Sequence, residues 1–158
     1  MSVSYSVEIK NAKELEQAMR KYPKIAQPIV ARAIKGAEAV LHGNAKEPNV
    51  PAKTRRLIQS FEFERKNPLS TRFFPTVKYA IYVHRGTRPH IIRYKGTGRG
   101  GLYNQKTKTG FGRVVNHPGT EGNPFMAKIL EQSQSKIDSL FEKALDGITK
   151  EVARQASS

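Results

Sequence analysis

The stretch PFMAKILEQSQSKIDSLFEKALDGITKEVARQ, residues 124–155, decides the fold of this chain. Its apolar side chains recur every three or four positions, the period of an amphipathic helix: Met126, Leu130, Ile137, Phe141, Ala144, Ile148 and Val152. Asn123 is a residue type that caps helices, and Pro124 suits the first helical position. The stretch therefore predicts one helix of 32 residues, about 48 Å long at about 1.5 Å per residue. Either its distal part packs on a neighbouring subunit, or the helix breaks near Gly147.

The residues before position 50 predict a strand followed by two helices. Apolar and polar side chains alternate over residues 3–9, which is the period of a strand with one buried face. A short helix is expected to open at Asn11 and to end before Pro23. A longer helix then runs to residues 42–44, with Pro28 expected in its first turn, where a proline is tolerated.

The middle of the chain predicts short extended segments. We expect one or two helical turns within residues 54–60 and strands at residues 60–65, 72–77, 79–84, 90–94 and 113–116. Residues 95–113 are rich in glycine and predict a long mobile loop. The whole chain, residues 1–158, is thus predicted to be a single α+β domain. A small antiparallel sheet would pack with the N-terminal helices and the long C-terminal helix, and the glycine-rich basic loop would lie outside this core.

The charge of the chain is concentrated in its middle. The formal net charge is +15, and no acidic residue lies between Glu64 and Glu121, although that window holds twelve Lys and Arg residues. Such a surface attracts polyanions, either nucleic acid or an acidic protein partner, and its alternative is a solvated face. The candidate contacts with DNA or with another subunit are Arg85, Arg88, Arg93, Lys95, Arg99, Lys106, Lys108 and Arg113. Tyr94, Tyr103 and Phe111 are candidates for stacking on bases, or for packing at the ends of the loop.

Several function classes are disfavoured by composition. The chain has no cysteine, so it has no disulfide, no thiolate metal site and no cysteine nucleophile. No apolar run is long enough for a membrane span or resembles a signal peptide. His84, His90 and His117 have no local carboxylate partner, which disfavours a metal site and a Mg²⁺-dependent nuclease. We expect no metal and no cofactor. A metal-independent ribonuclease with His84 or His117 as general base is a remote alternative.

Four motifs follow one another along the chain: Val50-Pro51-x-x-Thr54-x-x-Leu57-x-x-Ser60, Tyr79-Ala80-x-Tyr82-Val83-x-x-Gly86-Thr87-Arg88-Pro89-His90, His117-Pro118-Gly119-Thr120 and Pro124-Phe125. In this order they resemble the neck or tail-completion proteins of long-tailed double-stranded DNA phages, also known as head-tail joining or minor tail proteins. The resemblance covers most of the chain. Two positions depart from the family pattern: Lys53-Thr54-Arg55 replaces an Asp-Thr-Gly phrase, and His84-Arg85 replaces an acid before the Gly-Thr turn.

The resemblance implies a non-enzymatic structural protein of the virion, made in the cytoplasm of the bacterial host. It implies a ring of six or twelve copies at the head-tail junction. Its partners would be the connector or head-closure protein, the tail terminator or tail tube protein, and double-stranded DNA in the lumen, with no membrane. The motif residues would have structural roles. The charge block by itself allows a second reading, a free-standing basic nucleic-acid-binding protein.

Overall fold

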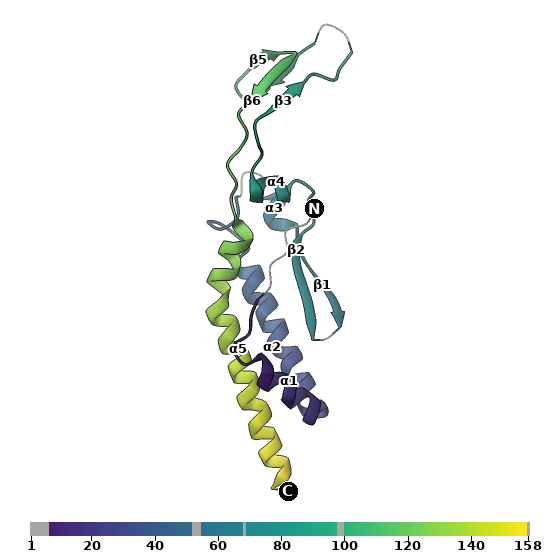
Figure 1. The fold of residues 1–158 in the computed structure, drawn as a ribbon, viewed down its shortest axis with the longest axis vertical. Helices are drawn as coiled ribbons and strands as arrows, with labels where there is room; N and C mark the ends of the chain where they lie inside the picture. The colour runs from purple at the N-terminus through teal and green to yellow at the C-terminus, as the bar shows by residue number, and fades with distance from the viewer. Residues whose placement is uncertain (1–6, 52–54, 68, 98–99, 158) are drawn as a thin grey trace. The chain divides into compact units, whose positions relative to one another are not determined.

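The computed structural model describes residues 7–51, 55–67, 69–97 and 100–157 (Figure 1). The chain divides into two compact units: Met1–Ala80 together with Pro124–Ser158, and Ile81–Asn123. From the sequence, the same residues are predicted to form one domain. The α+β class is confirmed, with helices at both ends of the chain and antiparallel strands between them.

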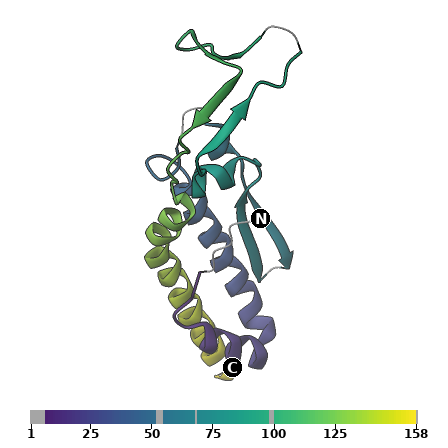
Figure 2. The ribbon, with the colours of Figure 1, turned by 45° about the horizontal axis from the view of Figure 1, so that its top comes forward.

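Three helices form most of the first unit: α1 (Ala12–Lys21), α2 (Pro23–Asn44) and α5 (Phe125–Ala156). α2 and α5 lie side by side along their lengths (Figures 1 and 2). They run antiparallel, because Asn44 at the end of α2 bonds Ser133 early in α5, whereas Ile29 near the start of α2 lies beside Gly147.

The long C-terminal helix has the predicted 32 residues and is not broken at Gly147. It begins one residue later than predicted: Pro124 is the N-cap residue, and Asn123 lies outside the helix. The backbone N–H of Asn123 donates to the carbonyl of Val83 instead.

The prediction for Pro28 was wrong. α2 starts at Pro23, directly after α1, so Pro23 takes the first-turn position and Pro28 lies inside the helix. Because a proline has no N–H, the carbonyl of Lys24, four residues earlier, receives no helical hydrogen bond from Pro28. Both Pro28 and Lys24 are exposed, so water can solvate this carbonyl.

The core of the first unit lies where the helices meet a two-stranded ribbon. Its buried apolar side chains come from all three helices and from residues 45–61: Leu15, Ala26, Val30, Ile34, Leu41, Val50, Leu57, Phe61, Phe125, Ile129, Ile137, Phe141 and Ile148. The ribbon pairs β1 (Phe61–Asn67) with β2 (Ser70–Pro75) in antiparallel register. Phe61 stacks on Phe73 at 4.9 Å and meets the edge of Phe125 at 6.0 Å between ring centroids, which joins the ribbon to α5.

An ion pair joins the same ribbon to α2. The guanidinium of Arg65 donates through both Nε and Nη2 to the carboxylate of Glu38, with Nε 2.7 Å from Oε1. Glu38 is almost fully buried in α2, and these hydrogen bonds hold the pKa of its carboxyl below the ordinary value, against the opposing effect of burial. A bidentate pair of this kind fixes direction as well as distance.

Amide side chains fix the register between α2 and α5. Asn49 and Gln132 exchange two hydrogen bonds of 2.7 and 2.9 Å, and Asn49 also donates to the carbonyl of Asn44. Asn44 donates to the hydroxyl of the fully buried Ser133, which in turn donates to the carbonyl of Ile129. The buried side chains of Asn49 and Ser133 thus have hydrogen-bond partners, as burial requires.

The remaining elements correct several predictions. The helical turn expected within residues 54–60 is α3 (Arg56–Gln59). The strand expected at 72–77 starts earlier, as β2, and the strand expected at 79–84 is a helix, α4 (Ala80–Arg85). A strand is expected at residues 3–9. Residues 7–9 form no strand, and residues 3–6 lie outside the described residues.

The single sheet of the prediction is replaced by separate two-stranded antiparallel sheets in the described chain: β1–β2, β3–β6 and β4–β5. β3 (His90–Arg93) and β6 (Val114–His117) match the strands expected at 90–94 and 113–116. The predicted loop at 95–113 contains a hairpin of β4 (Leu102–Asn104) and β5 (Thr109–Gly112), and its mobility stays a prediction.

Candidate functional site

The candidate site lies on the second unit, in the segment between residues 86 and 120 that we call the basic ribbon. β3 and β6 lie side by side in it (Figure 2). Their register pairs Ile91 with Asn116 and Arg93 with Val114. Because side chains alternate across a strand, these four lie on one face of the ladder. The pairs Ile92–Val115 and His90–His117 lie on the other.

Two of the sequence motifs meet at one end of the basic ribbon. Thr87 and Thr120 form a reciprocal backbone bridge: each N–H donates to the other's carbonyl, at 2.9 and 3.0 Å. The glycines that precede them, Gly86 and Gly119, have φ angles of 75° and 92°, a region that favours glycine. A Cβ on Gly119 would lie 2.3 Å from the Thr87 carbonyl oxygen, so a side chain there is incompatible with the bridge.

Two histidines stack beside this bridge. His90 and His117 face each other across the ladder, with ring centroids 5.0 Å apart. Nδ1 of His117 accepts a hydrogen bond from the N–H of Gly119 at 3.1 Å, whereas Nδ1 of His90 lies 2.8 Å from the carbonyl of Arg88 and donates to it. Both Nδ1 atoms are therefore engaged in holding the turns, and this arrangement explains the histidines without catalysis.

His84 is buried in α4. Burial, and then the charge of Arg85, lower the pKa of His84 below its ordinary value, so the folded chain favours the neutral ring. A neutral imidazole is what a general base needs.

Among the described residues, no three His, Asp or Glu side chains gather in a way that could hold a metal ion.

The described bases of the second unit are exposed, and none of them takes part in an ion pair found among the described residues. The side chains of Arg85, Arg88, Arg93, Lys95, Lys106, Lys108 and Arg113 are all exposed, and Arg99 lies outside the described residues. Every ion pair found in the described part of the chain joins residues of the first unit. The sequence prediction that these bases form a one-signed surface is therefore matched by their exposure.

The ribbon also exposes apolar side chains. Ile91 and Val114 are 55% and 51% exposed, and Tyr103 and Phe111 are 58% and 48% exposed. Ile91 and Val114 are not among the site residues predicted from the sequence. Their signal was present in the pairs Ile91-Ile92 and Val114-Val115, because two consecutive β-branched residues must place one of them on each face of a strand. Tyr94 packs over the glycines that follow it, in agreement with a packing role at the end of the loop.

The other motif residues are divided between core and surface. Leu57 and Phe125 are buried at 3% and 1% exposure, as expected of packing anchors. Pro51, Pro89 and Pro118 are exposed in turns, Pro124 caps α5, and Tyr79 and Tyr82 are exposed. Thr54 lies outside the described residues. The structure thus brings together the Gly-Thr and Pro-Gly-Thr motifs but gives the remaining motifs local roles.

Two concavities of the first unit are lined by described residues, and neither lining carries a catalytic set. An apolar groove of about 730 Å³ is bordered by α1, α2, α5 and β2, and the charged residues of its described lining are Glu16 and Arg72. A groove of about 600 Å³ lies along α2 and α5 and is rimmed by Lys24, Arg32 and Lys143.

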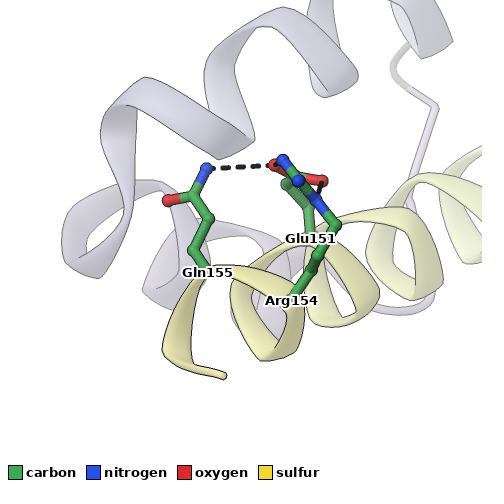
Figure 3. A network of polar contacts seen from close by, with 3 residues as sticks. All are labelled: Glu151, Arg154 and Gln155. Carbon is green, nitrogen blue, oxygen red and sulfur yellow. Dashed lines mark hydrogen bonds and ion pairs between the residues drawn. The ribbon is translucent and has the colours of Figure 1, made fainter. Parts of the chain in front are cut away.

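The acid at the rim of the second groove, Glu151, is held in an ion pair (Figure 3). Arg154 donates two hydrogen bonds to its carboxylate, at 2.7 and 3.0 Å, and Gln155 donates one at 3.0 Å. These bonds lower the pKa of Glu151 to about 2. Such a carboxylate stays ionised at neutral pH and is unsuited to general acid or base work.

Comparison with known proteins gives no match: no family model, no curated protein and no solved structure is similar to this chain. Among the helices of the described residues, none is both long and apolar enough to span a membrane.

Proposed function

We propose that this chain is a non-enzymatic structural protein of a phage neck, a tail-completion or head-tail joining subunit that assembles into a ring around the DNA channel. It would act in the virion, between the connector or head-closure protein and the tail terminator or tail tube. The proposal rests on the resemblance of the motif series. The single structural observation in its favour is the use of those motifs: Gly86-Thr87 and Gly119-Thr120 serve a backbone bridge, and Leu57 and Phe125 serve the core.

The length of α5 no longer supports self-association by itself. α2 and residues 45–50 accompany the helix from Gln132 to Gly147, so this part of its length is used within its own unit. The support for assembly comes instead from the basic ribbon, where none of the described residues from 85 to 123 is buried. An isolated two-stranded ladder is at best marginally stable in water, and contact with a neighbour would stabilise it.

The test is an assembly experiment in the phage that encodes this protein. Particles made without this protein should accumulate as filled heads and separate tails in negative-stain images, and supplying the protein in trans should restore joined virions. Sedimentation of the purified chain with purified tails should show its transfer to the tail fraction. Normal joined virions in the absence of the protein would refute the joining role.

A second candidate, a free-standing nucleic-acid-binding protein, is favoured by the described bases of the second unit, which are exposed and take part in no ion pair found among the described residues. It predicts duplex binding together with normal particle assembly when the protein is missing. The same images therefore separate the two candidates, since only the joining subunit is required for heads and tails to unite.

A further inference from the structure

We propose that the basic ribbon is a duplex-DNA contact, in which the β3–β6 ladder enters a groove and its bases reach the phosphates on either side. This inference deepens the proposed function and rests on it for the packaged DNA that the ribbon would meet. Its binding measurement does not depend on virion assembly.

The first step is the charge of the second unit. Residues 81–123 hold eight Lys and Arg residues and one acid, Glu121. The bases among them that the structure describes take part in none of the ion pairs found in the described chain. Like charges on a narrow ribbon repel one another, and binding a polyanion relieves this repulsion and releases counterions from the nucleic acid.

The second step is the distribution of these bases over the ladder. Arg93 pairs with Val114 and lies on one face, and the N–H of the next residue, Tyr94, donates to the carbonyl of Arg113 at 2.9 Å. Arg113 is thus one position further along the ladder than Val114, and its side chain belongs to the opposite face. Lys106 and Lys108 follow in the turn between β4 and β5, and Arg88 precedes β3. The ribbon carries bases on both faces and at both ends.

This distribution favours duplex DNA over an acidic protein surface. Protein interfaces bury an apolar centre and leave charges at its rim, on one side of the binding element. A two-stranded ribbon fits the major groove of B-DNA, where phosphates flank it on both sides. Bases on the two faces can then contact the two strands.

The exposed apolar side chains fit the same geometry. Ile91 and Val114 lie on the face that carries Arg93, and both are about half exposed. With one face turned toward each strand, Ile91 and Val114 would contact the sugars of the strand that Arg93 reaches. Tyr103 and Phe111 are exposed on the second ladder, where their rings are accessible for contact with the sugar-phosphate backbone.

The experiment measures binding of the full chain to a fluorescent 20-base-pair duplex by anisotropy, between 50 and 200 mM salt. The test variant is Arg93→Gln with Arg113→Gln, one base from each face. The matched control is Lys24→Gln with Lys143→Gln, which removes the same charge from the groove of the first unit. All four side chains are exposed, so circular dichroism should show unchanged folds.

Each phosphate contact contributes about 0.9 to the slope of log affinity against log salt. The slope of the test variant should therefore be shallower by about 1.8. Between 50 and 200 mM salt, the fold loss of affinity of the test variant should be about twelve times smaller than that of the unsubstituted chain. The control should keep the original slope. Equal loss in both double variants would overturn the inference, because binding would then report net charge alone. Equal competition by polyglutamate of the same total charge would also overturn it, in favour of an acidic protein partner.

The two proposals fail in different ways. Joined virions without the protein would refute the joining role but would leave the measured slopes as they are. Conversely, the DNA contact would be refuted if Arg93→Gln with Arg113→Gln left the slope of log affinity against log salt unchanged. A requirement of the protein for joining heads to tails would still support the proposed function.

Discussion

Two glycines of the α2–α5 pair allow one packing argument to be tested by matched substitutions. Gly147 lies in the middle of α5, and a Cβ added there would lie 3.9 Å from Cγ2 of Ile29, an ordinary van der Waals distance. Gly36 lies in the middle of α2, but a Cβ added there would lie 3.1 Å from Cδ1 and 3.3 Å from Cδ2 of Leu140. The same change, glycine to alanine, thus makes an ordinary contact in one helix and a tight one in the other.

Alanine is favoured over glycine in a helix interior by about 0.8–1.0 kcal/mol. We expect Gly147→Ala to raise the free energy of unfolding by about 1 kcal/mol, which corresponds to roughly 2–4 °C in Tm for a chain of this size. Gly36→Ala should have the same intrinsic gain but must displace Leu140, and overpacking costs about 1–3 kcal/mol. Its net effect should lie between about zero and 2 kcal/mol of destabilisation.

The assay is urea unfolding followed by helical circular dichroism, with a thermal scan as the second measurement. The difference between the two variants carries the argument, because it cancels the intrinsic preference for alanine. Equal shifts in the two variants, or a destabilised Gly147→Ala, would show that the two helices do not approach each other as described.

Three further outcomes are expected. Glu38→Gln should cost about 1 kcal/mol of unfolding free energy, discounted because its partner Arg65 is partly exposed. The pKa of Glu38 is lowered in the folded chain, so its contribution is present above the ordinary value of 4.5 and is lost as pH falls through the folded pKa. The free energy of unfolding of Glu38→Gln should therefore fall less steeply in acid than that of the unsubstituted chain. Identical slopes in the two proteins would contradict the ion pair between Glu38 and Arg65. Gly119→Ala should break the backbone bridge between Thr87 and Thr120, so that hydrogen exchange at the Thr87 amide becomes fast while the amides of α5 stay protected. Continued protection of the Thr87 amide would contradict the close approach of Gly119 to the Thr87 carbonyl. The pKa of His84 is lowered by burial and by a neighbouring charge, so the unfolded chain binds the proton more readily and stability should fall as pH drops below 6.5. His84→Gln should remove this slope in urea titrations, and an unchanged slope would assign the effect to another group.

The helices could be predicted from the sequence because their apolar stripes are long. Over the 32 residues of α5 the period of three and four is repeated many times, and a single glycine does not interrupt the packing against α2. The error at residues 79–84 has the opposite cause. Ile81, Tyr82 and Val83 have high strand propensity, but the segment is only a few residues long, and tertiary context decides short segments.

The β4–β5 hairpin was missed because burial does not alternate in it. All residues of β5 are exposed, so no period of two is present, and its glycines suggest a loop. A local signal did exist in Asn104: its side-chain oxygen accepts hydrogen bonds from the N–H groups of Lys106 and Thr107, which is the turn chemistry of asparagine.

The composition of the candidate site could be predicted, but its geometry could not. The run of bases without an acid identifies the basic ribbon from the sequence alone. That Arg93 and Arg113 lie on opposite faces depends on the register of β3 and β6, which the hydrophobic pattern does not specify when both faces carry β-branched residues. That Thr87 meets Thr120 depends on a contact between positions far apart in the sequence.

The bridge between Thr87 and Thr120 is made by main-chain atoms, and the two glycines beside it are required for their backbone shape. The bridge itself does not depend on the side chains between these residues, although Nδ1 of His90 and Nδ1 of His117 hold the turns beside it. Residues 91–116 therefore form an exchangeable insert, whose length, charge and contact chemistry can change while the same two glycine-threonine pairs hold its ends together. A scaffold of this kind can be adapted to a new binding surface without redesign of its core.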